Sequence, residues 1–126
     1  MKIFTFESER FRPFLPDDCQ VNPNVLGFEL AEWLARELAL RACPTSYPSN
    51  EDWGWYLEEC REEQEHLICC GGGITEAGTH EWRVFVTQPK RLFRRPPATS
   101  RTEELERLVH QTLTDAGLIV SEDVRA

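Results

Sequence analysis

Apolar and polar residues follow one another along the chain in patterns that predict both strands and helices. Residues 2–7 form a short segment rich in aromatic and β-branched residues, which favours a first strand. Residues 8–22 contain two prolines and a pair of aspartates, and proline cannot donate a hydrogen bond to a sheet. We therefore expect a long surface loop there, with Phe11, Phe14 and Leu15 turned inward.

A first helix is predicted by apolar residues that recur every three or four positions. Asn22 suits the cap of this helix and Pro23 its first turn. We expect the helix to end near Arg41, before Pro44. The residues on its apolar face are Leu26, Leu30, Trp33, Leu34 and Leu38.

A second helix is predicted near the end of the chain, where the local signals are strongest. Ser100 is expected to cap it, and Glu103 completes a capping box three residues later. Gly117 is the expected terminator. Residues 118–120, Leu-Ile-Val, then predict one short final strand.

Between the two helices, three segments have the composition of strands and are separated by turn residues. They span residues 53–60, 65–71 and 80–88, and the connections R-E-E-Q and G-G-I-T-E-A-G-T fit an antiparallel meander. In the third segment, successive side chains point to opposite faces of the strand, so one face is apolar and consists of Trp82, Val84 and Val86.

The predicted order of elements is β-α-β-β-β-α-(β), which indicates an α+β fold. Strands grouped between two amphipathic helices are most simply arranged as a two-layer sandwich, a mainly antiparallel sheet with both helices on one face. The other face of the sheet is then left for solvent or a partner. No repeat or internal boundary divides residues 1–126, so we expect a single globular domain.

Composition and charge narrow the range of partners. The chain has 126 residues, of which 40% are hydrophobic, and this is enough apolar material for one core. Its formal net charge is -8, and because binding phosphates needs positive surface, nucleic acid is not expected as the main partner. Residues 51–65 carry seven carboxylates against one arginine, whereas residues 81–101 carry six cations against one carboxylate. We therefore expect a dipolar molecule.

Cysteine usage and the absence of long apolar runs indicate the compartment. Cys69 and Cys70 would point to opposite faces of a strand, and five cysteines do not suggest a disulfide framework. No run approaches the roughly 18 apolar residues of a membrane span, and charges interrupt the N-terminal residues too early for a signal peptide. We expect a reduced, cytoplasmic protein with no membrane association.

The stretch E-D-W-G-W-Y-L-E-E-C, residues 51–60, has two interpretations. A regular strand would place Trp53 and Trp55 on one face and Tyr56 on the other. Gly54 would let a neighbouring backbone approach closely. Both tryptophans then either fill the core between sheet and helices, or form an exposed aromatic patch with an acidic border, which is typical of an interface.

The carboxylates of this region do not predict acid/base catalysis. Glu58 and Glu59 are neighbours on a strand, so their side chains diverge. Glu62, Glu63 and Glu65 lie in a turn, where water would screen them. Neither arrangement supplies the burial that separates the pKa values of an acid and a base. We expect a solvated acidic rim.

Cysteine and histidine leave one catalytic arrangement open. Cys70 and His80 could meet across a hairpin, with Gly71–Gly73 offering N–H groups to an oxyanion; the alternative is a buried cysteine before a glycine-rich turn. A metal site is not expected, because His66 and Cys70 would lie about 13 Å apart at roughly 3.3 Å per strand residue. No Lys-Ser/Thr follows the glycines, so they do not form a phosphate loop. We expect neither metal nor cofactor.

The basic stretch Q-P-K-R-L-F-R-R-P-P, residues 88–97, has the composition of a small anion-binding or nucleic-acid-binding element. Phe93 lies among its charges. The acidity of the whole chain instead favours a solvated loop that pairs with the acidic turn.

Two segments resemble those of small bacterial proteins. Residues 16–34, P-D-D-C-Q-V-N-P-N-V-L-G-F-E-L-A-E-W-L, carry an N-P-x-x-x-G helix start, and residues 46–57, S-Y-P-S-N-E-D-W-G-W-Y-L, carry an E-D-W-G-W strand start. The resemblance implies bacterial origin. It brings no established activity and no catalytic residues.

These observations predict a non-enzymatic protein that binds another protein through its free sheet face and acidic rim. A basic partner that must be neutralised or regulated, as a toxin is by an immunity protein, suits the charge. The alternatives are a small enzyme that uses Cys70 with His80, and a homodimer built by pairing sheets or sheet edges. The expected partner-binding residues are Trp53, Trp55, Tyr56, Glu58, Glu59, Glu62 and Glu63.

Overall fold

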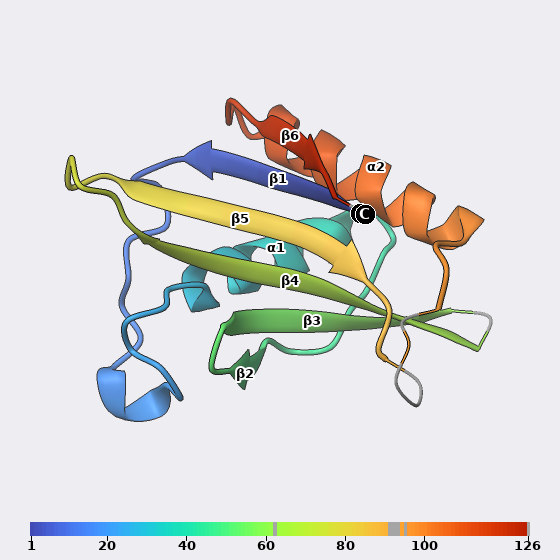
Figure 1. Ribbon diagram of the computed structural model, residues 1–126, viewed down its shortest axis with the longest axis horizontal. Coiled ribbons are helices and arrows are strands. Elements are labelled where there is room, and N and C mark those ends of the chain that lie inside the picture. Colours follow the sequence, from blue (N-terminus) through green and yellow to red (C-terminus); the bar gives the residue numbers. More distant parts are fainter. Residues whose placement is uncertain (62, 91–93, 95, 126) are drawn as a thin grey trace.

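The structure is a computed structural model that describes residues 1–61, 63–90, 94 and 96–125. Within them, six strands form one antiparallel sheet in the order β2-β3-β4-β5-β1-β6, and the two α-helices lie behind it (Figure 1). The predicted α+β architecture and element order are confirmed. The elements are β1 (Lys2–Glu7), the 3-10 helix η1 (Asp17–Cys19), α1 (Phe28–Leu40), β2 (Ser49–Glu51), β3 (Gly54–Arg61), β4 (Gln64–Ile74), β5 (His80–Thr87), α2 (Ser100–Asp115) and β6 (Ser121–Val124).

The core lies between the sheet and the helix layer. Both helices present leucine-rich stripes to the sheet, as predicted for the first, and burying each such side chain stabilises the fold by roughly 1.5–3 kcal/mol. Trp82 is fully buried, and its indole Nε1 donates a hydrogen bond to the Ser8 carbonyl at 2.9 Å. The largest fully buried apolar side chains also include Phe4, Leu30, Leu34, Leu38, Leu57, Ile68, Leu105, Leu113, Val84 and Val86.

The three central strands form the predicted meander, but β4 is longer than expected. Gly71–Gly73 lie within β4 and not in a loop, because each pairs with a residue of β5. Gly72 pairs with Trp82, and a Cβ atom at Gly72 would come within 2.6 Å of the indole ring. The glycine therefore makes room for the largest side chain of the core.

Helix α1 begins at Phe28, six residues after the predicted cap at Asn22. The Asn22 side chain accepts a hydrogen bond from the Asn24 backbone, which forms a local turn. Leu26 then bridges to β4, with its N–H donating to the Gly72 carbonyl at 3.0 Å. Pairing with the sheet thus holds this segment out of the helix.

Helix α2 is capped by Thr99, one residue before the predicted Ser100. Thr99 and Thr102 form the reciprocal capping box, whereas the predicted Glu103 is exposed. At the other end, Gly117 has a φ of 84° and terminates the helix as expected.

The final strand lies later than predicted. The Leu118 N–H donates to the Leu113 carbonyl, which holds residues 118–120 at the end of α2, where Leu118 and Val120 pack on the core. The final strand is β6, which pairs with the free edge of β1, and its side chains are exposed. It is an edge strand joined to the sheet by its backbone.

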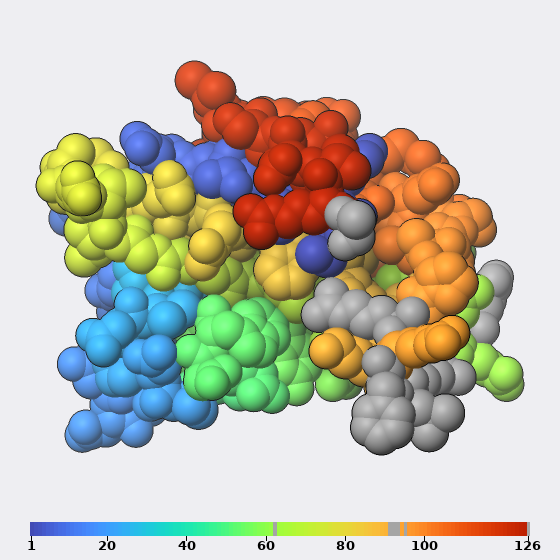
Figure 2. All heavy atoms as spheres, viewed as in Figure 1, coloured from blue at the N-terminus to red at the C-terminus, as the bar shows by residue number. Residues whose placement is uncertain are grey.

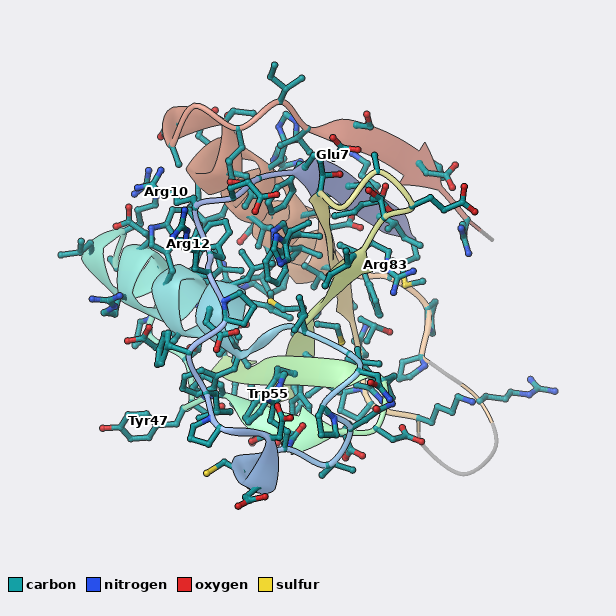
Figure 3. All side chains as sticks on the ribbon, turned by 90° about the vertical axis from the view of Figure 1, so that its left-hand side faces the viewer. Glu7, Arg10, Arg12, Tyr47, Trp55 and Arg83 are labelled. Carbon is teal, nitrogen blue, oxygen red and sulfur yellow. The ribbon has the colours of Figure 1, made fainter. Side chains whose placement is uncertain are left out.

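The long loop after β1 is fastened to α1 through a buried carboxylate. Glu29 Oε2 accepts hydrogen bonds from the backbone N–H groups of Phe14 and Leu15, each at 3.0 Å. Phe11 is buried as expected, but Phe14 is 65% exposed, which corrects its predicted inward position. Figure 3 shows Arg10 of this loop on the α1 side of the sheet and Arg83 on the opposite side.

Candidate functional site

The sheet face that carries no helix contains a hollow of about 550 Å³. This open face is turned toward the viewer in Figures 1 and 2, with the β2–β3 hairpin in green along its lower edge. The floor consists of partly buried apolar side chains of β3, β4 and β5, and carboxylates stand around it. The lining residues are Glu51, Trp53, Tyr56, Glu58, Glu65, Leu67, Cys69, Phe85, Thr87, Gln88, Pro89 and Lys90.

The β2–β3 hairpin places Trp53 on this open face. Glu51 pairs with Gly54, so Asp52 and Trp53 form a two-residue turn. Gly54 has a φ of 148°, which residues with a side chain rarely adopt, and a Cβ atom there would lie 2.5 Å from the Cys70 carbonyl oxygen. Strand alternation is therefore broken at Gly54, which permits the predicted close backbone approach.

Three aromatic rings meet in the hollow as a result. The centroid of Trp53 lies 6.2 Å from that of Tyr56 and 6.4 Å from that of Phe85, with interplanar angles of 29° and 36°. Trp53 is 41% exposed, whereas the other two rings are half-buried. The three rings come from a turn and two different strands, and form one aromatic surface open to solvent.

Trp55 lies on the helix side of the sheet, so the prediction that it shares a face with Trp53 is wrong. It is 6% exposed and packs edge-on against Phe28 of α1 at a centroid distance of 5.0 Å. The two interpretations of the W-G-W stretch thus each hold for one ring, and Trp55 is removed from the partner-binding set.

The acidic rim is supplied by Glu51, Glu58 and Glu65, all exposed. Among the described residues, none of the three lies within 4 Å of a cationic nitrogen. Lys90 supplies the positive charge among the described lining residues, and these residues together carry a net charge of -2. A cation would be attracted to this hollow and an anion repelled.

Glu59 points away from the hollow and is 4% exposed, which corrects its assignment to the solvated rim. Its Oε1 accepts hydrogen bonds from Nε and Nη2 of Arg101 in α2, at 3.2 and 2.9 Å. The same guanidinium donates to Glu104 at 3.1 Å and to the Cys43 sulfur at 3.7 Å. Glu59 therefore holds β3 to α2 and is not available to a partner.

His66 lies beside this ion pair and is fully buried. Its Nε2 lies 2.8 Å from the Thr102 hydroxyl, while its Nδ1 faces Glu59 Oε2 across 3.9 Å, and neither of these facing atoms has a hydrogen-bond partner among the described residues. Burial lowers the pKa of His66, and this outweighs the opposing effect of Glu59. The imidazole is therefore neutral near pH 7.

Glu59, His66 and Thr102 line up a carboxylate, an imidazole and a hydroxyl, but this cluster does not supply a nucleophile. Thr102 is 5% exposed, and its hydroxyl already accepts the Thr99 N–H in the capping box. The cluster instead connects the β3–β4 hairpin to the first turn of α2.

The structure separates the residues that the Cys70–His80 interpretation needs together. Cys70 pairs with Val84, whereas His80 pairs with Ile74 four residues along β4. His80 is bound to Glu9 through its Nδ1 at 2.6 Å. Cys70 is fully buried, and burial raises the pKa of its thiol, so the thiolate nucleophile is disfavoured.

The predicted partner-binding residues thus divide between two faces and a turn. Trp53, Tyr56 and Glu58 line the hollow. Glu63 is exposed in the β3–β4 turn, and Glu62 lies outside the described residues. Phe85 and Leu67 were not predicted as part of the site, although alternation along β5 already placed Phe85 opposite the buried valines.

No protein-family model, curated protein or solved structure matches the chain. All five cysteines are free thiols. In the described part of the chain, no group of three potential ligands from His, Cys, Asp and Glu could hold a metal ion, and no helix is long and apolar enough to cross a bilayer. Function is therefore inferred from the geometry and charge of the hollow.

Proposed function

We propose that the protein is a non-enzymatic binding module that neutralises or regulates a basic protein partner through the open face of its sheet. The hollow with its aromatic surface and acidic rim carries this proposal. Aromatic side chains are enriched at the centre of protein interfaces, and complementary charge selects partners and speeds their encounter.

The distribution of charge supports a basic partner. The chain carries a net charge of -8, and the hollow concentrates three of its carboxylates beside exposed tryptophan surface. A partner with lysines and arginines would satisfy these carboxylates, whereas an acidic or nucleic-acid partner would be repelled.

A second copy of the chain is a less suitable occupant of this face. A symmetric pairing of two open faces would place the rim formed by Glu51, Glu58 and Glu65 against itself. Like charges brought together in this way oppose association.

The cytoplasm suits this proposal as the place of action. Five free thiols are stable in a reducing compartment, where disulfide formation is suppressed. A cytoplasmic immunity-like protein would meet its basic partner there.

Co-purification with a matched pair of double variants tests the proposed function. Trp53→Ala/Glu58→Gln removes one exposed ring and one carboxylate from the hollow. Tyr47→Ala/Glu76→Gln makes the same change elsewhere: Tyr47 is 92% exposed and points away from the body (Figure 3), and Glu76 is exposed in the β4–β5 loop. Tagged wild type and both variants would be used to capture proteins from native lysate of the source organism.

The expected result is a protein of basic sequence that wild type and the Tyr47/Glu76 variant retain, and that the Trp53/Glu58 variant retains at least about tenfold less. Its retention should also fall as salt is raised, because the attraction is between exposed charges. Identical retained proteins for all three forms would show that the hollow is not the binding surface and would overturn the proposal.

A further inference from the structure

The shape and charge of the hollow indicate which chemical group of a partner would bind in it. This inference rests on the proposed function. Its volume of about 550 Å³ lies within the usual range of binding pockets and exceeds the size of a single functional group. It is therefore large enough for one long side chain together with the backbone that carries it.

The aromatic surface favours a flat cation. The Trp53 ring lies beside Tyr56 and Phe85, at centroid distances of 6.2 and 6.4 Å, and it is 41% exposed, so part of its surface is open to a ligand. The face of an aromatic ring attracts cations, and tryptophan does so best. A planar guanidinium can lie parallel to the exposed part of such a ring.

The carboxylates favour a group with several N–H donors. Glu58 lies two residues from Tyr56 on β3, and Glu65 lies two residues from Leu67 on β4, so both stand on the same face as the rings. A guanidinium has five N–H donors in a planar fork and can stack on a ring while it donates to a carboxylate. An ammonium group is a compact charge that cannot stack in this way.

Other occupants fit less well. An anion would face a net charge of -2 on the lining residues that the structure describes. A purely apolar group would remove water from Glu51, Glu58 and Glu65 without giving them a hydrogen-bond donor, which is costly.

We propose that the hollow binds an arginine side chain of the basic partner, with the guanidinium stacked on Trp53 and hydrogen-bonded to Glu58, which lies next to Tyr56 on the same face of β3, while Glu65 adds to the negative charge of the rim. Arginine is one of the residue types that most often dominate binding free energy at interfaces, so one such anchor accounts for the joint presence of aromatic and acidic groups.

The probe for this proposal is a blocked tripeptide, acetyl-Gly-Arg-Gly-amide. It is compared with the same peptide containing citrulline, which keeps the planar shape without the charge, and with the lysine peptide. The readout is the indole N–H signal of Trp53 in a ¹H–¹⁵N spectrum of the full chain, assigned by its loss in Trp53→Phe.

The arginine peptide should shift the Trp53 signal saturably, with a dissociation constant on the order of 1 mM for a single side chain. Binding should be at least about tenfold weaker for citrulline and about threefold weaker for lysine. Glu58→Gln/Glu65→Gln should weaken arginine binding at least about fivefold, whereas Glu76→Gln should leave it unchanged. Equal shifts from the arginine and citrulline peptides, or equal binding by the three forms, would refute the proposal.

The two proposals can fail separately. If the Trp53/Glu58 variant loses a basic partner but the arginine peptide does not bind, the module function stands and the arginine anchor is wrong. If the peptide binds as expected but capture is the same for all forms, the hollow recognises arginine and the function proposed above is wrong.

Discussion

Gly54 decides which face of the sheet each of its neighbours occupies. Its φ of 148° ends the regular alternation that would have placed Trp53 and Trp55 side by side. Trp53 consequently lies in the open hollow with Tyr56, while Trp55 lies in the core. One residue without a side chain thus separates a ring that can meet a partner from one that holds the fold together.

Tryptophan accessibility distinguishes the two rings in solution. Trp53 is 41% exposed and Trp55 only 6%, so a soluble quencher reaches the first far more readily. We expect Trp53→Phe to reduce the fraction of fluorescence that acrylamide quenches, and Trp55→Phe to leave most of it. The opposite assignment would contradict the turn conformation at Gly54.

His66 predicts how stability depends on pH. Burial lowers its pKa below the ordinary value of 6.5, so the folded state resists protonation that the unfolded chain accepts. Above pH 6.5 both states are neutral at this position; as pH falls below 6.5 the unfolded chain binds a proton first, and the free energy of unfolding decreases. The slope contributed by this group is at most about 1.4 kcal/mol per pH unit.

Chemical denaturation between about pH 7.5 and about pH 5.5 measures this effect. His66→Gln should lose the decrease, and His110→Gln, which removes a half-buried histidine of α2, should keep it. The pKa values of Glu9 and Asp115 are also lowered, but these groups change stability only below their ordinary pKa values of 4.5 and 3.8. They therefore do not contribute between about pH 5.5 and about pH 7.5. An unchanged slope in His66→Gln would show that another group titrates.

At the level of elements, the capping box predicted for α2 is present, but it begins one residue earlier than expected. Ser100 with Glu103 and Thr99 with Thr102 both suit the start of a helix, and the chain uses the second pair. Thr102 is turned inward, where its hydroxyl meets His66 of β4. Contact with the sheet therefore selected the helix start, as contact between Leu26 and Gly72 did for α1.

The buried ion pair between Glu59 and Arg101 is expected to matter more than a surface pair of the same length. In both this pair and Arg41–Asp115 the shortest N–O distance is 2.9 Å, but only the first is nearly inaccessible to water. Arg101→Met leaves a buried carboxylate unpaired and should lower the free energy of unfolding by about 3–5 kcal/mol.

The matched control is Arg41→Met, for which the expected loss is at most about 1 kcal/mol. Both are measured by urea denaturation. A second variant, Glu59→Leu/Arg101→Met, should regain part of the stability because no charge is left buried. Similar losses for the two single variants would mean that the β3–α2 contact does not depend on this pair.

In the whole molecule, both helices cover the same face of the sheet, so the other face is open to solvent. The net charge of -8 is spread unevenly, and the hollow gathers Glu51, Glu58 and Glu65 from β2, β3 and β4. The predicted pairing of the basic stretch, residues 88–97, with the acidic turn lies partly outside the described residues. Arg101 forms an ion pair with Glu59 and is therefore not a free surface charge. Glu59 and Arg101 neutralise each other inside the fold, so among the described residues the charge of the hollow is set by Glu51, Glu58, Glu65 and Lys90.

The acidic open face predicts a monomer in solution. Self-association through the hollow would oppose like charges, so sedimentation at low salt should give a mass near 14.6 kDa across a wide concentration range. A doubled mass that Glu58→Gln/Glu65→Gln leaves intact would favour a dimer formed at a sheet edge. A doubled mass that depends on Trp53 would identify a second copy as the occupant of the hollow.

The sequence by itself determined the fold class, β1, the meander and the apolar face of the helices. The reason is that each element buries one face in the core, and this face is visible in the spacing of apolar residues along the chain. Alternation along β5 also correctly placed Val84 in the core. Only tertiary structure decided that Trp53 and Trp55 part at Gly54, that Glu59 is buried against Arg101, and that the two helices begin where contacts with β4 allow. These outcomes depend on contacts between residues far apart in the chain, whose positions no local pattern encodes.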